Sequence, residues 1–78
     1  MEEAISFEEL RKRAGFKLTK LAREAGVSPS SIYRIEGGKK VSFELVQSVL
    51  LVINKKLDTN YTISDLSGLN LGDQIFEG

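Results

Sequence analysis

The chain has 78 residues, contains neither Cys nor His, and carries 11 basic side chains (Lys and Arg) against 11 acidic ones (Asp and Glu). The length fits one small domain, and the composition excludes a disulfide framework, the usual zinc site and a His general base. We therefore expect no enzyme, no metal and no cofactor. The zero net charge, taken as an average, also argues against nucleic acid, because phosphate-binding proteins are usually basic.

The charges are not spread evenly along the chain. Residues 1–9 hold four acidic residues and no basic one, residues 10–40 hold nine basic against two acidic residues, and residues 41–78 hold two basic against five acidic residues. The middle stretch therefore carries +7 between ends of −4 and −3. A local field of this size attracts phosphate, although a solvated helix face would explain it equally well.

No membrane segment is evident. The longest apolar run, Val49–Ile53, is far shorter than the roughly 18 residues that a spanning helix needs. The first nine residues are acidic, whereas a signal peptide begins with basic residues. We expect no membrane association and a cytoplasmic location.

Serine N-caps and glycine stops divide the first 56 residues into segments with helical apolar periodicity. Ser6 and Ser42 precede two of the segments, and Ser28-Pro29 begins a third with an N-cap and a proline at the first helical position. The predicted helices cover residues 7–14, 18–25, 29–36 and 43 to about 54–56. This pattern predicts a compact all-α domain of four to five helices.

The second and third predicted helices are joined only by Gly26-Val27-Ser28. A short turn containing glycine makes two helices cross at about 90–120°, which is the helix-turn-helix unit. Gly26 tolerates a left-handed backbone, and Ala22 is small where the next helix packs against it. The apolar residues expected to close this small core are Leu21, Ala25, Val27, Ile32 and Ile35.

The pattern changes after residue 56. Residues 1–56 are expected to form the helical domain, and residues 57–78 a tail for dimerisation or partner binding. Within the tail, Asn60–Leu66 is equally compatible with a β-strand and with a loop, and the remainder is expected to be loop or disordered.

Residues 10–53 resemble the lambda-repressor-like, Cro-type helix-turn-helix (XRE) family of DNA-binding transcriptional regulators. The resemblance rests on the motifs LRKRAG at residues 10–15, KLAREAGVS at residues 20–28 and IYRIEGGK at residues 32–39. It implies double-stranded DNA as the partner, with the helix at residues 29–36 in the major groove. Two residues depart from the family pattern. Leu18 stands where the family often has a phosphate-binding Gln, so that contact is missing or comes from Lys17 or Thr19, and Pro29 replaces a frequent polar reader, so fewer direct base contacts are expected.

The resemblance also implies the contact residues. Base contacts fall on Ser28, Pro29, Ser30, Tyr33 and Arg34, among which Arg34 is the best reader because its fork can pair with guanine. Ser28 is equally well explained as an N-cap alone. Phosphate contacts fall on Lys17, Thr19, Lys20, Gly37, Gly38, Lys39 and Lys40, the glycines through their N–H groups. Arg11 and Glu36 match a structural pair that ties the first helix to the third.

A homodimer is expected because one small domain reads only half a site. Its interface is predicted at the end of the fourth helix and the tail, from apolar residues left over beside the core: Leu45, Leu51, Val52, Leu57, Tyr61 and Ile63. One form that this interface can take is a β-ribbon in which Asn60–Leu66 of the two copies pair. The alternative is that the tail folds back to complete the core of its own domain.

The sequence therefore favours a sequence-specific DNA-binding regulator, most simply a repressor. One alternative is the antitoxin of a toxin–antitoxin module, which binds operator DNA and holds a toxin protein through the tail. Another is a protein-interaction module that has kept the fold but lost DNA binding.

Overall fold

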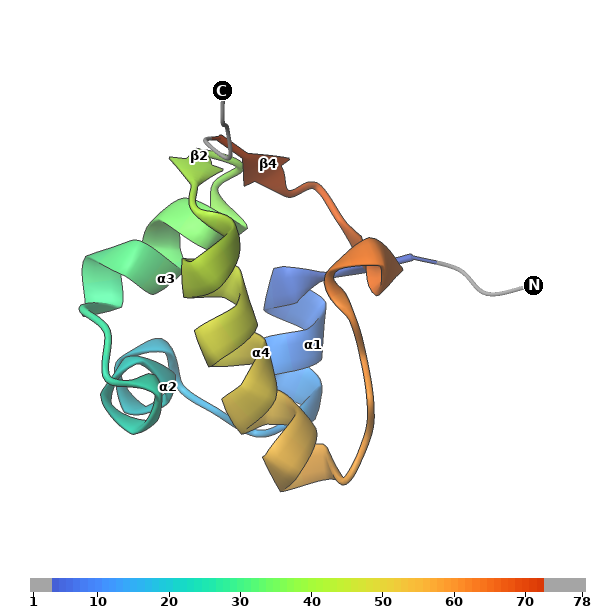
Figure 1. Cartoon of the computed structure of the whole chain (residues 1–78). Coiled ribbons are helices and arrows are strands. Elements are labelled where there is room, and N and C mark those ends of the chain that lie inside the picture. The colour runs from blue at the N-terminus through green and yellow to red at the C-terminus, as the bar shows by residue number, and fades with distance from the viewer. Residues whose placement is uncertain (1–3, 73–78) are drawn as a thin grey trace.

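Four helices build the domain, and a computed structural model describes residues 4–72 of it. The helices are α1 (Phe7–Arg13), α2 (Leu18–Ala25), α3 (Pro29–Glu36) and α4 (Phe43–Leu57) (Figure 1). The 3₁₀ turn η1 (Ile63–Asp65) and four two-residue strands complete it: β1 (Ile5–Ser6), β2 (Lys40–Val41), β3 (Leu66–Ser67) and β4 (Asn70–Leu71). The all-α fold class is confirmed, and the helix bounds agree with the prediction within about one residue.

The helices form where the sequence supplies caps and stops. The hydroxyls of Ser6 and Ser42 accept hydrogen bonds from the amides of Glu9 and Leu45, both at 3.1 Å, and so begin α1 and α4. Gly26 ends α2 in the left-handed conformation, with φ of 72°, and directs the chain into α3. Asp58 ends α4 in the same conformation, although it is not a glycine.

The core lies where α1, α2, α3 and α4 meet. Every buried residue in the described part of the chain is hydrophobic, and α2 and α3 contribute Leu21, Ala22, Ile32 and Ile35 to it. Burying an aliphatic side chain of this size stabilises the fold by about 1.5–3 kcal/mol. The inward face of α3 is therefore fixed, and its opposite face is left to solvent.

The tail folds back over the helices. Asn54 holds it after α4: its amide nitrogen donates to the Tyr61 carbonyl at 2.9 Å, and its amide oxygen accepts from the Tyr61 N–H at 2.9 Å. Strand β3 then pairs in parallel with β1, with Leu66 buried in the core. Strand β4 pairs in parallel with β2 (Figure 1).

The strand expected within Asn60–Leu66 lies further along the chain. Most of that segment is irregular or belongs to η1, which a capping box between Thr62 and Asp65 begins. The strands of the tail pair with segments of their own chain, so the β-ribbon between two copies is not what these strands form. Residues 73–78, which include the apolar Ile75 and Phe76 of the predicted tail, lie outside the described residues.

Candidate nucleic-acid interface

The outward face of α3 carries the side chains predicted to read bases. Ser28, Pro29, Ser30, Tyr33 and Arg34 are all exposed, and Tyr33 keeps 71% of its surface accessible. Ile32 and Ile35, on the opposite face, are buried. The apolar anchoring of one face thus presents the other as a continuous polar surface.

Ser28 occupies the N-cap position of α3, but its side chain forms no capping bond. Its hydroxyl instead lies 3.2 Å from that of Ser30 and 3.1 Å from that of Ser31. The predicted N-cap position of Ser28, followed by Pro29, is confirmed, although the hydroxyl does not bond to the helix backbone. These three hydroxyls form a cluster of donors and acceptors at the N-terminal end of α3.

The guanidinium of Arg34 makes one hydrogen bond within the described residues. Its Nη2 donates to the Lys40 carbonyl at 3.4 Å, which is a long hydrogen bond. A guanidinium has five N–H donors, so this bond leaves enough for a bidentate contact with a base. The side chain is thus partly oriented before any partner arrives.

The loop after α3 offers lysine side chains and no free glycine N–H groups. The N–H groups of Gly37, Gly38 and Lys39 donate to the carbonyls of Tyr33, Ile35 and Arg34 respectively, at 2.9–3.3 Å. The end of α3 therefore already uses the glycine N–H groups that the sequence prediction assigned to phosphate. Lys39 and Lys40 are exposed and remain the cationic groups of this loop.

Helices α2 and α3 lack the two features that stabilise the N-termini of α1 and α4. Neither has a side-chain capping bond or an acidic residue in its first turn, whereas α1 and α4 have both. The positive end of each helix dipole is therefore offset by neither a side-chain cap nor a carboxylate in the first turn. Lys17, Thr19 and Lys20, at the start of α2, are also exposed.

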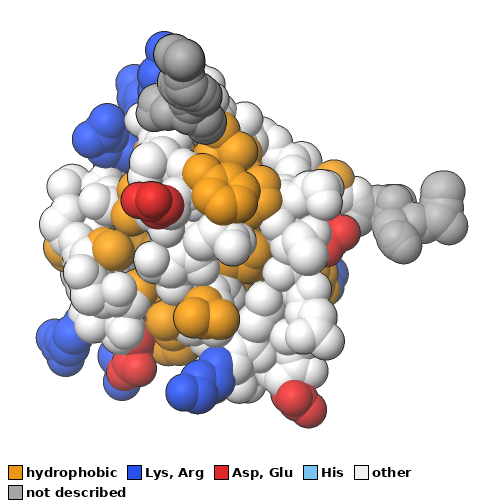
Figure 2. All heavy atoms as spheres, in the orientation of Figure 1, with side chains coloured by type: hydrophobic (Ala, Val, Ile, Leu, Met, Phe, Trp, Pro, Cys, Tyr) orange, Lys and Arg blue, Asp and Glu red, His pale blue; other side chains and the backbone are white. Residues whose placement is uncertain are grey.

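Ion pairs divide the basic residues into two groups. Arg11, Lys12, Arg13 and Lys20 each pair with a carboxylate. Within residues 4–72, Lys17, Arg34, Lys39 and Lys40 form no such pair. Figure 2 shows Lys and Arg side chains gathered beside β2, which follows the loop. These four cations occupy candidate contact positions. Arg23, Lys55 and Lys56 are equally without an ion pair in the described residues but lie elsewhere, and the candidate contact Lys20 is paired with Glu24.

Arg11 and Glu36 fix the end of α3 against α1. Arg11 donates from Nε to Glu36 Oε2 at 2.5 Å and from Nη2 to Oε1 at 3.2 Å, and from Nη1 to the Phe16 carbonyl at 3.0 Å. The two side chains are only 12% and 11% exposed. A bidentate pair of this kind sets orientation as well as distance.

Glu8 lies nearer to this surface than the sequence suggests. A hollow of about 430 Å³ at the end of α3 is lined by Glu8 together with Tyr33, Arg34, Glu36, Gly37 and Lys39. Glu8 also pairs with Lys12 at 3.2 Å, which offsets its negative charge. The position of Glu8 beside α3 depends on how α1 packs on α3, and no local sequence motif predicts it.

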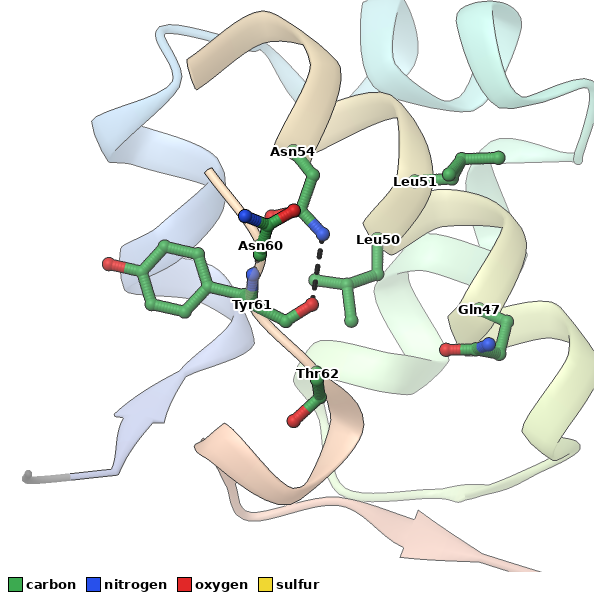
Figure 3. Close-up of a pocket in the computed structure, with 7 residues that line it drawn as sticks. All are labelled: Gln47, Leu50, Leu51, Asn54, Asn60, Tyr61 and Thr62. Atoms are coloured by element: carbon green, nitrogen blue, oxygen red, sulfur yellow. Dashed lines mark hydrogen bonds between the residues drawn. The ribbon is translucent and has the colours of Figure 1, made fainter. Parts of the chain in front are cut away.

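A second surface, along α4, is apolar. Phe43 and Leu51 are 47% and 68% exposed, and Gln47 lies between them on the same face. Figure 2 shows hydrophobic side chains along the line that α4 follows in Figure 1. Beside Leu51 is a hollow of about 300 Å³ between α4 and the tail, lined also by Gln47, Asn54 and Tyr61 (Figure 3).

The predicted dimer residues do not all lie on that surface. Leu51 is exposed, whereas Leu45, Val52, Leu57, Tyr61 and Ile63 are partly buried against the core of their own chain. Their side chains turn inward because the tail and the flank of α4 cover each other.

Residues 4–50 match the family model of the helix-turn-helix domain. The match covers more than half of the chain, which therefore belongs to this family of DNA-binding proteins. Neither the curated proteins nor the solved structures contain a match to this chain. Within the described residues no helix is long and apolar enough to cross a membrane, and no group of three or more acidic residues is placed to hold a metal ion.

Proposed function

We propose that this protein is a sequence-specific regulator of transcription, most simply a repressor, that binds double-stranded DNA as a homodimer in the cytoplasm. The observation that carries the proposal is the exposed face of α3, flanked by cations without ion-pair partners in the described residues. The helical part, residues 1–56, carries the DNA contacts. No step of this function needs catalysis or a cofactor.

The N-terminal end of α3 enters the major groove, and α2 crosses the backbone beside it. Arg34 reads guanine through O6 and N7, which is worth about 1–3 kcal/mol of discrimination. Ser28 and Ser30 add adaptable hydroxyl contacts, Pro29 an apolar one, and Tyr33 a contact to a thymine methyl or a phosphate. Because few of these groups are strong readers, DNA shape supplies the rest of the specificity.

Phosphate contacts come from two places. Lys17, Thr19 and Lys20 accompany the uncapped N-terminus of α2, where backbone N–H groups and the dipole favour an anion. Lys39 and Lys40 supply charge from the loop after α3, where Gly37 and Gly38 let the backbone pass close to the DNA. Such contacts make binding salt-dependent, because each releases counterions from the DNA.

The domain is of the lambda-repressor-like, Cro type. The ion pair between Arg11 and Glu36 supports this assignment, because it joins the two positions at which the sequence resemblance implies a structural pair. The tight turn at Gly26 supports it in the same way.

The homodimer forms through the apolar face of α4. If a two-fold axis passes near Gln47, Phe43 of one copy faces Leu51 of the other, because each lies four residues from the axis along an antiparallel helix pair. The hollow beside Leu51 gives room for an inserted side chain. Sedimentation of the wild-type chain at micromolar concentration tests this arrangement, and a monomer contradicts it.

Selection of bound sequences from random duplex DNA, repeated at two salt concentrations, tests the function. The proposal predicts enrichment of a palindromic site with half-sites about one helical turn apart. Enrichment of no sequence at either salt concentration contradicts it and favours a protein-interaction module. A single, non-palindromic half-site contradicts the dimer alone.

The antitoxin alternative has less support. Residues 66–67 and 70–71 of the tail are paired with the protein's own strands, and Leu66 is buried, so these parts of the tail are not available to hold a toxin.

A further inference from the structure

The C-terminal strand lies against the loop that carries the candidate DNA contacts. Strand β4 pairs with β2 so that Asn70 is opposite Lys40 and Leu71 opposite Val41. The Gly72 N–H donates to the Val41 carbonyl at 3.0 Å, which extends the pairing by one bond. The Asn70 side chain donates to the Gly38 carbonyl at 3.3 Å. Three successive residues of the tail, Asn70, Leu71 and Gly72, thus pair with the segment between α3 and α4.

The side chain of Lys40 lies directly over Gly72. A Cβ at position 72 would stand 1.9 Å from Lys40 Cγ and 2.3 Å from Lys40 Cδ. No real Cβ makes contacts this short, so any side chain at position 72 displaces the stem of Lys40. Glycine at this place therefore lets the lysine adopt its observed conformation.

Strand β4 also supports Arg34, through β2. Arg34 Nη2 donates to the carbonyl of Lys40, and Lys40 is the β2 residue that pairs with Asn70 of β4. A change in the path of β2 would therefore reach a base-reading side chain and a phosphate-contacting one together.

The loop needs an external support of this kind. It begins with Gly37 and Gly38, and glycine loses more backbone freedom on ordering than any other residue. The support is itself anchored, because Leu69 and Leu71 pack against the core and Leu66 is buried in it. The segment after α3 is thus bonded on one side to the end of α3 and on the other to an anchored strand.

We propose that β4 and Gly72 form a positioning element for DNA binding, which holds β2 so that Lys40 and Arg34 are presented to DNA in a fixed arrangement. This inference rests on the proposed DNA-binding function. It assigns the tail a role in the DNA site, although the tail itself contributes no contact to DNA.

A double-mutant cycle tests the proposal, using the full chain with Gly72→Ala, Lys40→Ala and the two changes combined. The readout is the affinity for the duplex selected by the wild-type protein, at one salt concentration, with the thermal midpoint measured for each variant. Gly72→Ala is expected to weaken binding about 3- to 10-fold, which lies within the range of coupling between touching residues. In the Lys40→Ala background it is expected to change binding less than about twofold, because the new Cβ then meets no long side chain.

A second pair of variants guards against a loss of folding. Asn70→Ala removes one hydrogen bond to the loop and leaves the strand backbone in place, so it should weaken binding by about twofold without lowering the thermal midpoint. Asn60→Ala changes an exposed asparagine of the same tail that forms no side-chain hydrogen bond within residues 4–72, and it should have no effect.

The outcomes distinguish the positioning role of β4 and Gly72 from the proposed DNA-binding function. Equal losses from Gly72→Ala in both backgrounds, or unchanged binding by Gly72→Ala and Asn70→Ala, overturn the positioning role and leave DNA binding intact. A wild-type chain that binds no duplex at low salt overturns the proposed function and this inference with it.

Discussion

At the scale of single residues, Arg11 connects three parts of the chain. Its guanidinium donates to both oxygens of Glu36 at the end of α3 and to the Phe16 carbonyl between α1 and α2. Because the carboxylate is almost covered, removing it leaves a desolvated positive charge without compensation. The pair therefore sets the orientation of α3 more than it adds net stability.

Glu36→Ala is expected to lower the free energy of unfolding by about 1.5–3 kcal/mol, the value of hydrogen bonds to a charged group. Urea titration followed by circular dichroism measures the change. Glu24→Ala is the matched control, because it removes only an exposed i, i+4 pair with Lys20 and should cost less than about 0.5 kcal/mol. Equal losses for the two variants would contradict the orienting role of Arg11 and Glu36.

At the scale of the elements, the helix N-termini fall into two classes. Those of α1 and α4 are capped by serine and followed by glutamate, which stabilises the helices. Those of α2 and α3 have no side-chain cap, and exposed lysines stand at the start of α2. The start of α2, where the proposed function places a phosphate, thus lacks the stabilising cap that α1 and α4 have.

Lys17→Ser tests this division directly. Lys17 has the same extended backbone, with φ of −78° and ψ of 154°, as the capping serines, so a serine there can cap α2. We expect unfolding free energy to rise by about 0.5–1 kcal/mol and DNA affinity to fall, because a cation is lost and an N–H group is occupied. Lys17→Ala should weaken binding without the gain in stability. A serine variant with unchanged affinity would remove this N-terminus from the interface.

The helices were predictable from sequence, and the strands were not. Serine caps, glycine stops and apolar stripes act within a few residues, so they set the bounds of α1 to α4 locally. Strands β1 and β3 are two residues each and join Ile5 to Leu66, while β2 and β4 join Lys40 to Asn70. Pairing across such sequence separations has no local signal, and it also determines which apolar residues of the tail are covered.

The candidate site was predictable to a similar extent. Exposure of Tyr33 and Arg34 follows from the helical period, because Ile32 and Ile35 must face the core. The bonds of Gly37 and Gly38 to the end of α3 depend on backbone geometry that composition does not specify. Glu8 and Gly72 join the surroundings of the site only through tertiary packing.

At the scale of the whole molecule, zero net charge is an average over unlike surfaces. The acidic residues of the basic stretch, Glu24 and Glu36, are both engaged in ion pairs, and Glu8 and Glu9 pair within α1. What remains includes the unpaired cations Lys17, Arg34, Lys39 and Lys40 at the candidate contact positions and an apolar face along α4. The two surfaces fit the two partners proposed, DNA and a second copy.

The salt dependence of binding tests the central claim most directly. Affinity for duplex DNA is measured over a series of salt concentrations for the wild type, for Lys39→Ala and for Lys55→Ala, a control in the last turn of α4, at the opposite end of that helix from β2 (Figure 1). We predict that log K falls linearly with log salt, that Lys39→Ala reduces the slope by about one unit, and that Lys55→Ala leaves it unchanged. A wild-type affinity independent of salt, or the same slope for Lys39→Ala as for the wild type, would contradict the account.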